Sequence, residues 1–281
     1  MKTLLTTCIL TALFVTAQSQ DNDKKFRFGL KMTPSFNWLK IDDTKTFEGN
    51  GAVMKFGYGL ITEFNLTGTI WFSTGLQVDY DGGRIRTTST DPFLDNTSGK
   101  VFYQYDENKG LAEYDNTDNG YKTYWLRERT YRTTYITLPI QLRMKTKEIG
   151  MLTYFGNIGI NASFQAKTRV TDVTNQINSG GGLGYQSSTT EFDRLVMSDD
   201  MNPVRLGLVI GGGAEMNLSG STSLLFGLHF FQGFTNTVKK ESKYLLDGEK
   251  TTAASTTEYK PVAQEQKFLN NNITITVGVL F

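Results

Sequence analysis

The C-terminal segment alternates between apolar and other side chains up to the last residue. Its apolar face comprises Ile273, Ile275, Val277, Val279 and Phe281, and its opposite face comprises Thr274, Thr276, Gly278 and Leu280. Alternation with a period of two predicts a β-strand whose two faces meet different environments. A strand of this kind that ends on an aromatic residue, in a chain that begins with a secretion leader, predicts an outer-membrane β-barrel.

The first residues have the layout of such a leader. Lys2 precedes an apolar run over residues 9–15, and the small residues Ala17 and Ser19 follow it. We interpret residues 1–19 as a signal peptide that is cleaved near residues 17–20, and residues 20–281 as a single domain. The run is far shorter than the roughly 20 apolar residues of a membrane-spanning helix. Cys8, the only cysteine, lies inside the leader, so we expect no disulfide in the mature chain.

Seven more segments repeat the alternation seen at the C-terminus. They are residues 26–36, 53–66, 70–80, 131–144, 152–167, 204–217 and 224–233. Each is long enough to cross a bilayer as a tilted barrel strand, which needs roughly 9–11 residues. Pro139 is the awkward residue, because proline has no N–H for the ladder and usually marks an edge strand or a bulge.

The connections between these segments alternate in length. Short ones at residues 67–69, 146–150 and 218–221 alternate with long polar ones at residues 37–52, 81–130, 168–203 and 234–269. Outer-membrane barrels have an even strand number, short periplasmic turns and longer outer loops. We therefore predict an all-β fold, an eight-stranded antiparallel up-and-down transmembrane β-barrel with four long extracellular loops and three short periplasmic turns. Residues 100–105 and 121–131 hold enough aromatic and β-branched side chains to extend strands above the membrane.

The polar faces of the predicted strands would line the barrel interior. They contribute Arg27, Lys31, Lys55, Glu63, Gln77, Asp79, Arg143, Asn157, Asn161, Arg205, Glu215 and His229. An eight-stranded interior is just wide enough for side chains to fill, so we do not expect a water-filled porin channel. Because unpaired polar and charged groups are costly in a low-dielectric interior, we expect these side chains to satisfy one another in a network.

Four short motifs resemble a known family. They are FRFGLK at residues 26–31, YITLPI at residues 135–140, GGGAE at residues 211–215, and the terminal Phe281. In these motifs and in its layout the chain resembles the PorT-like outer-membrane β-barrel proteins of Bacteroidota, and more broadly the eight-stranded barrels of the OmpA and OmpX type. The resemblance implies a location in the cell outer membrane. Some family members are linked to type IX secretion and gliding, so the resemblance also implies envelope or secretion-system proteins as partners.

No residue pattern predicts a catalytic, cofactor-binding or metal site. His229 is the only histidine, and its place in the middle of a lumen-facing strand fits a structural hydrogen bond better than general acid–base catalysis. Asp42–Asp43 and Asp199–Asp200 offer carboxylates for calcium, but paired loop aspartates are usually solvated. The glycine-rich run at residues 180–184 lacks the lysine and the strand-to-helix context of a phosphate loop, so we interpret it as a loop tip.

Aromatic residues and glycines give further expectations about position. We expect Trp71, Tyr80, Tyr154 and Phe281 in the interfacial aromatic girdles, which flank the lipid-facing band. Trp38 and Trp125 lie in or beside loops, which makes them candidates for contact with a partner. The three glycines at residues 211–213 lie inside a strand pattern, where glycine allows close packing or a bulge.

Charge and pattern together lead to a functional expectation. Loss of the leader with Lys2 takes the 29 Lys and Arg to 28, equal to the 28 Asp and Glu, which gives no sign of a nucleic-acid partner. We predict a non-enzymatic outer-membrane protein without a cofactor, an envelope anchor or an assembly or secretion component whose loops or turns contact protein partners. The alternatives are a narrow porin-like channel for small solutes, a surface enzyme, and a soluble lipocalin-like carrier with its apolar side chains inside.

Overall fold

A computed structural model describes residues 25–42, 44–88, 101–107, 110–113, 121–177, 185–253 and 256–281, without the side chains of residues 248–262. The predicted signal peptide, residues 1–19, lies outside the described residues, as does the glycine-rich run at residues 180–184. The described chain folds into antiparallel β-sheet. None of its helical residues forms a helix long and apolar enough to cross a membrane.

The described elements follow one another as strands, with one short 3-10 helix. They are β1 (Phe26–Met32), β2 (Ser35–Ile41), β3 (Phe47–Gly49), β4 (Val53–Lys55), β5 (Gly57–Thr67), β6 (Ile70–Thr87), β7 (Val101–Asp106), β8 (Gly110–Ala112), β9 (Lys122–Lys145), β10 (Leu152–Ile177), β11 (Tyr185–Val196), η1 (Ser198–Asp200), β12 (Val204–Ser219), β13 (Thr222–Gly233), β14 (Glu241–Ala253), β15 (Thr256–Glu265) and β16 (Phe268–Leu280).

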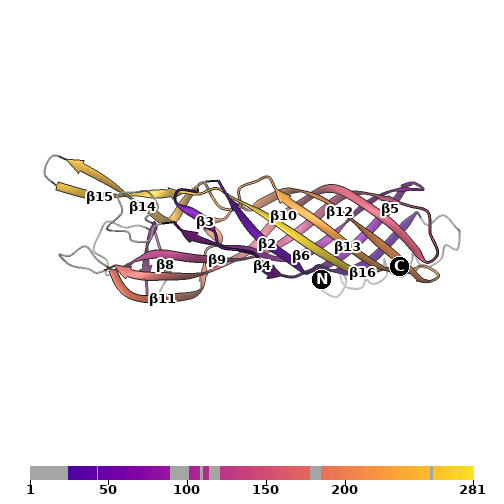
Figure 1. Ribbon diagram of the computed structural model, residues 1–281, viewed down its shortest axis with the longest axis horizontal. Helices are drawn as coiled ribbons and strands as arrows, with labels where there is room; N and C mark the ends of the chain where they lie inside the picture. The colour runs from indigo at the N-terminus through magenta and orange to yellow at the C-terminus, as the bar shows by residue number, and fades with distance from the viewer. Residues whose placement is uncertain are drawn as a thin grey trace, which may run out of the picture.

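Eight of the described strands pair in a closed circuit. The order is β1–β5–β6–β9–β10–β12–β13–β16, and β16 pairs again with β1, with Gly29 opposite Leu280 and Met32 opposite Val277. Each circuit strand therefore has a partner on both sides. Closure matters in lipid, because an unpaired backbone N–H or C=O finds no water there. In Figure 1 these strands wind around the right half of an elongated molecule.

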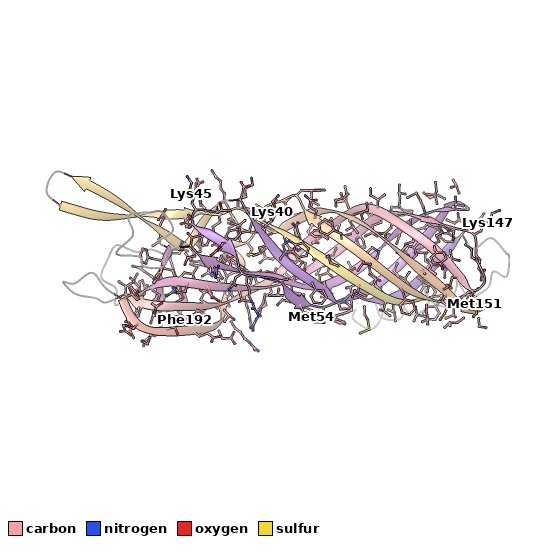
Figure 2. All side chains as sticks on the ribbon, viewed as in Figure 1. Lys40, Lys45, Met54, Lys147, Met151 and Phe192 are labelled. Carbon is pink, nitrogen blue, oxygen red and sulfur yellow. The ribbon has the colours of Figure 1, made fainter. Side chains whose placement is uncertain are left out.

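Three short connections lie together at one end of the circuit, which we call the turn end. β5 passes to β6 through residues 68–69, β9 to β10 through residues 146–151, and β12 to β13 through residues 220–221. Gly68, Gly150 and Gly220 have φ angles of 52°, 67° and 57°, in the left-handed region that favours glycine. The short turns predicted from the sequence are confirmed at all three places. Lys147 and Met151 mark this end in Figure 2.

The predicted strands match the circuit, with two breaks. Residues 26–36 form β1 and the start of β2, and residues 53–66 form β4 and β5. Pro139 is not on an edge, because β9 pairs with both β6 and β10. Instead, the β6–β9 pairing skips Gly75 and Leu76 opposite the proline, and Thr74 Oγ1 donates to the Pro139 carbonyl at 2.7 Å. The missing N–H thus interrupts the ladder locally without ending the strand.

The circuit strands turn apolar side chains outward, and many of their inward side chains are polar, beside a buried apolar group of Ile61, Phe155, Leu225 and Leu280. Leu30, Leu60 and Leu228 are 60%, 52% and 58% exposed, whereas the inward Glu63 and Asn157 are 0% and 2% exposed. We call the outward apolar side chains of the circuit strands the belt. A soluble barrel would have the reverse arrangement, so the lipocalin-like alternative is wrong. Side chains cover the outside of the circuit along its whole length (Figure 2).

The remaining strands form a second body on the circuit, which we call the head. It comprises the described residues of 37–52, 81–133, 167–203 and 234–271, where β6, β9 and β10 continue past the belt and other strands pair onto them. It occupies the left half of Figure 1. The predicted strand extensions are confirmed by β7 and β9. The interpretation of the other long segments as loops is wrong for much of their described length, which is strand.

The head has an apolar core of its own. The buried residues of this core are Leu39, Phe47, Ile85, Val101, Tyr103, Tyr124, Leu126, Tyr131, Val170, Leu195, Met197, Met201, Val238, Leu245 and Phe268. The ring of Phe268 packs edge-on against Phe47 at 5.4 Å between centroids and against Tyr131 at 6.2 Å. Most of these residues come from β2, β3, β6, β7, β9, β10, β11, β14 and β16, and Met197, Met201 and Val238 lie in connections. The core therefore joins segments that are far apart in the sequence.

Candidate functional site in the lumen and the head

Five charged side chains from four strands fill the lumen near the turn end. This turn-end ion cluster comprises Arg27, Glu63, Arg143, Lys145 and Glu215, each at most 10% exposed. Arg27 Nη1 lies 2.6 Å from Glu215 Oε2, and Lys145 Nζ lies 2.6 Å from Glu63 Oε2 and 2.7 Å from Glu215 Oε1. Arg143 pairs with Glu63. Loss of one partner would leave a buried charge uncompensated, so the cluster fixes the four strands against one another.

Aromatic rings and a glycine line the walls around this cluster. The Arg143 guanidinium lies 4.3 Å from the centre of the Phe155 ring, and Lys145 Nζ lies 4.5 Å from the Trp71 ring, both in cation–π range. A Cβ on Gly213 would lie 1.9 Å from the Phe226 carbonyl oxygen and 2.7 Å from Phe155 Cζ. The prediction of close packing at the glycines is therefore confirmed. Trp71 is 8% exposed on the lumen side, so its placement in an aromatic girdle is wrong.

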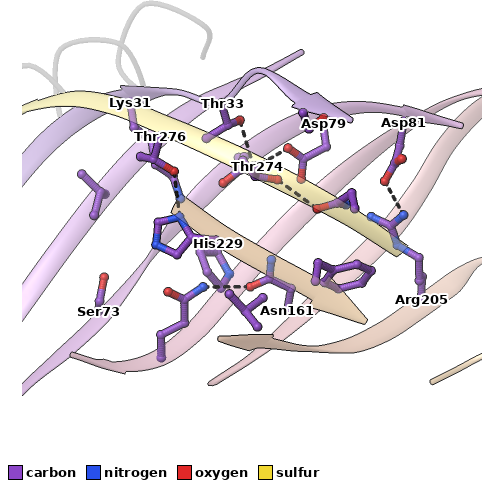
Figure 3. Close-up of a pocket in the computed structure, with 18 of the residues that line it drawn as sticks. Lys31, Thr33, Ser73, Asp79, Asp81, Asn161, Arg205, His229, Thr274 and Thr276 are labelled. Carbon is purple, nitrogen blue, oxygen red and sulfur yellow. Dashed lines mark hydrogen bonds and ion pairs between the residues drawn. The ribbon is translucent and has the colours of Figure 1, made fainter. Parts of the chain in front are cut away.

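A small polar cavity lies in the middle of the lumen. Its volume is about 60 Å³, and its lining includes Lys31, Asp79, Asn161 and His229 (Figure 3). A site of this size holds a few water molecules. His229 Nδ1 lies 3.2 Å from Thr276 Oγ1, a hydrogen bond within the lumen rather than a pairing with an acid. The predicted structural position of His229 is confirmed.

A second buried ion pair closes the lumen between the cavity and the head. Arg205 pairs with Asp81, and its Nη1 donates to Asn270 Oδ1 at 3.0 Å (Figure 3 shows the ion pair). The guanidinium lies 4.1 Å from the Tyr135 ring and 4.9 Å from the Phe231 ring. We call this group the Arg205 layer. Arg205 was predicted to face the lumen, but its partner Asp81 was not, because the sequence pattern ended that strand at Tyr80.

The predicted polar network is largely confirmed. Besides the two charged groups, Gln141 Nε2 donates a hydrogen bond to Asn161 Oδ1 at 3.1 Å and Gln141 Oε1 accepts one from Asn157 Nδ2 at 2.8 Å. Gln77 also donates a hydrogen bond to Asp79. Lys145 was missed as a member, because the predicted strand ended at residue 144. Continuing the alternation of Arg143 by one more step would have found Lys145, whereas no sequence signal connects it to Glu63 and Glu215.

The head holds a fully buried ion pair. Arg129 Nε and Nη2 donate to the two carboxylate oxygens of Asp172 at 2.7 Å each, and both side chains are 0% exposed. Burial alone would lower the pKa of Arg129, but the paired carboxylate holds that pKa above the ordinary arginine value. Burial also raises the pKa of the neighbouring Tyr103 and Tyr131 hydroxyls. The pair ties β9 to β10 inside the head.

Two of the four aspartates weighed as calcium ligands, Asp42 and Asp200, already contact protein groups. The carboxylate of Asp200 accepts from Ser242 Oγ at 2.5 Å and from the Lys243 backbone N–H at 2.7 Å. Asp42 lies 2.9 Å from Lys267 Nζ, and this hydrogen bond lowers the pKa of Asp42. Asp43 lies outside the described residues. Among the described residues, no three His, Cys, Asp or Glu side chains gather in a metal-binding group.

The two tryptophans proposed for partner contact have different positions. Trp125 is 0% exposed and packs between the Tyr185 ring at 5.3 Å and the Arg127 guanidinium at 4.6 Å, so that candidate is wrong. Trp38 is half-buried, with its ring 6.2 Å from the outward Phe230 ring at the head side of the belt. Tyr80, Tyr154 and Phe281 are 44%, 47% and 41% exposed, as expected for lipid-facing positions.

The sequence comparisons assign a family. Residues 16–239 match the model of the family described as outer membrane protein beta-barrel domain. The chain belongs to this family, and the protein lies in the outer membrane, with the lipid bilayer around it. No curated protein matches the sequence.

Solved outer-membrane proteins resemble the chain only weakly. Ail, the attachment invasion locus protein of Yersinia pestis, is 6% identical with a TM-score of 0.34, covering 92% of this chain and 99% of that one. OprG from Pseudomonas aeruginosa is 10% identical with a TM-score of 0.37, covering 91% and 95%. The protease OmpT from Escherichia coli is 8% identical with a TM-score of 0.40, covering 95% and 99%.

Proposed function

We propose that the protein is a non-enzymatic envelope component that holds the head outside the cell for contact with protein partners. The closed circuit is then an eight-stranded up-and-down transmembrane barrel. Its short turns face the periplasm, as is the rule for outer-membrane barrels, and the head faces outward. The belt supports this placement, because outward apolar side chains belong in lipid.

The head is the observation that carries the proposal. Its apolar core and its buried Arg129–Asp172 pair support a defined surface rather than a set of independent loops. The turn end offers only residues 68–69, 146–151 and 220–221 as connections. A large folded surface on one side and minimal turns on the other favour partners that bind from the head side.

The finer family assignment is part of the same proposal. The motifs at residues 26–31, 135–140 and 211–215 resemble PorT-like proteins of Bacteroidota, some of which are linked to secretion and gliding. An assembly or secretion role agrees with a protein that has a rigid, filled lumen and a folded outer body. Among the residues that the structure describes, His229 hydrogen-bonds to a threonine and to no acid, which favours a non-enzymatic role over a surface enzyme.

Site-specific crosslinking in living cells tests the proposal. A photoreactive amino acid replaces the exposed Lys240 or the exposed Lys40 on the head, and the matched control replaces Lys147 at the turn end. We expect a discrete protein adduct from at least one head position and none from the turn position. Adducts from Lys147 alone would place the partner in the periplasm and contradict the proposal.

A narrow channel is the second candidate, because a cavity does exist in the lumen. Its volume of about 60 Å³ lies between the turn-end ion cluster and the Arg205 layer, so solute would have to displace buried ion pairs on both sides. We therefore rank the channel below the anchor.

A further inference from the structure

Basic side chains gather in a groove on the outer wall, where the belt meets the head. The groove has a volume of about 320 Å³ and is lined by Lys55, Tyr80, Asp81, Arg132, Thr133, Thr134, Lys167, Arg169 and Arg194. Its size falls at the lower end of the roughly 300–1,000 Å³ typical of ligand sites. Five of these side chains are cationic. One of them is Lys55, so the prediction that Lys55 lines the barrel interior is wrong.

The pairing registers place this groove directly above lipid-facing residues. Val78, Ile136 and Phe164 lie side by side across β6, β9 and β10, and the last two are 43% and 50% exposed. One step toward the head, Tyr80, Thr134 and Lys167 form the next row. One further step brings Gly82, Arg132 and Arg169 into line. The cations thus begin where the belt ends.

A bulge turns two of the cations outward. The β9–β10 register shifts between Gln165 and Lys167, which inserts Ala166 as an extra residue. Without this shift, Lys167 would have followed the alternation of Phe164 to the inner face. With it, Lys167 is exposed and Thr168 is buried. Bulges commonly re-aim a side chain in this way.

The arrangement of the cations costs stability. Arg132 and Arg169 are directly opposed across β9 and β10, and like charges in directly opposed positions are destabilising. Arg194 has a φ of 57°, the only positive value at a non-glycine residue in the described chain. Such a conformation is uncommon for a residue with a side chain and carries strain. The opposed arginine pair and the strained backbone of Arg194 both cost stability, and both concern cations that line the groove.

The protein itself supplies little negative charge to the groove. Asp81 is engaged by Arg205 inside the lumen. Asp193 lies 3.5 Å from Arg132 and 3.4 Å from Arg194, and these side chains are about half exposed, so the pairs are weak. Within the part of the chain that the structure describes, Lys55, Lys167 and Arg169 have no ion pair, and Arg169 Nε is buried without a hydrogen-bond partner.

We propose that this groove binds the phosphate group of a lipid in the membrane leaflet beside the head. Arg and Lys donors form charge-assisted hydrogen bonds to phosphate, and the planar guanidinium suits two-point contact. The acyl chains of the same molecule would lie along Phe164 and Ile136 below the groove, contacts that a soluble anion could not use. The assignment to the outer leaflet rests on the proposed outward position of the head, whereas the lipid site itself does not.

Native mass spectrometry of the mature protein in detergent tests the site. The probe is lipid A with its phosphates, compared with the same lipid A after dephosphorylation. We expect the wild-type protein to retain the phosphorylated form and to bind the dephosphorylated form at least about tenfold more weakly, because charge-assisted hydrogen bonds are lost. The Arg132→Gln/Lys167→Gln/Arg169→Gln variant should show a similar loss. The matched control, Lys40→Gln/Lys239→Gln/Lys240→Gln, removes three exposed head cations outside the groove and should bind like wild type.

A single substitution separates binding from folding. Arg132→Gln removes the opposed arginine pair, so it should unfold at the same or a higher temperature than wild type while binding lipid A more weakly. A purely structural role would not produce this combination. Unchanged lipid A binding by the triple variant would overturn the proposal. Displacement of the lipid by inorganic phosphate would also overturn it, because the groove would then be a general anion site.

Labelling on intact cells tells the two proposals apart. A cysteine introduced as Lys240→Cys should react with a membrane-impermeant maleimide if the head is outside. Absence of reaction would contradict the outward head and the outer-leaflet assignment, while the mass-spectrometric result would still decide whether the groove is a phospholipid site.

Discussion

The fully buried side chains of Arg129 and Asp172 compensate each other's charge. Asp172→Asn should therefore destabilise the head by about 3–5 kcal/mol, because it leaves the Arg129 guanidinium buried beside a neutral group. Urea unfolding of protein in lipid vesicles, followed by tryptophan fluorescence, measures the change, since Trp125 lies buried in the head.

The exposed pair Arg86–Glu48 provides the control for that prediction. Its side chains are 52% and 43% exposed, and such pairs contribute about 0–1 kcal/mol. Arg86→Gln should leave the unfolding curve nearly unchanged. Equal shifts for Asp172→Asn and Arg86→Gln would mean that burial does not set the importance of ion pairs in the head.

The buried tyrosines predict how head stability depends on pH. Burial raises the pKa of Tyr103 and Tyr131 in the folded head above the value of about 10 in an unfolded chain. At a pH above that unfolded value, the unfolded chain has lost protons that the folded head retains, so stability falls as pH rises. Tyr103→Phe and Tyr131→Phe should each reduce the fall measured by urea unfolding between about pH 9 and 11. Curves parallel to wild type would contradict this explanation.

At the scale of strands, close approach of backbones in the circuit requires glycine at some positions and not at others. A Cβ at Gly213 would meet the Phe226 carbonyl at 1.9 Å, whereas at Gly156, on the adjacent strand, the nearest atom would be 3.9 Å away. Gly213→Ala should destabilise the barrel by about 1–3 kcal/mol, as overpacked sites do, and Gly156→Ala should be tolerated. Thermal midpoints from heat-modifiable gel mobility compare the two. Equal thermal midpoints for the two variants would show that the groups around Gly213 can move to accept a methyl group without loss of stability.

The belt strands could be predicted from the sequence, and the head could not. Lipid on one face and a filled lumen on the other require apolar and polar side chains to alternate with a period of two. This alternation is visible in the sequence, as in the outward Leu30 and the inward Arg27. Beyond the belt, water or protein can lie on either face, so the alternation fades in β7 and β14. Their pairing depends on contacts between distant segments, such as Phe102 opposite Leu246, for which a local pattern carries no signal.

The polar network was predictable in kind but not in pairing. Alternation placed Glu63, Arg143 and Glu215 inside, and the cost of burying charge required that they be paired. Which cation meets which carboxylate depends on strand register, and Lys145 and Asp81 lie just beyond the strand ends that the alternation indicated. The basic groove was equally hidden, because the bulge at Ala166 moves Lys167 to the outer face against the simple alternation.

For the whole molecule, three barriers lie in series along the axis. The turn-end ion cluster fills the lumen at one end, the Arg205 layer closes it beside the head, and the apolar core of the head lies beyond. Ions would have to cross the packed core of the head and two sets of buried ion pairs, which are costly to separate. A rigid, filled barrel of this kind suits a support for the head rather than a conduit.

Planar-bilayer recordings test this description of the whole molecule. The wild-type protein should give no stepwise conductance, because an eight-stranded interior filled with side chains leaves no continuous water path. Glu63→Gln should not open a pore either, since the Arg205 layer and the head core remain in place. A large porin in the same bilayer provides the positive control. Steps that appear with the wild-type protein, and change size with Glu63→Gln, would mean that ions pass through the turn-end ion cluster and would make the channel the better description of its function.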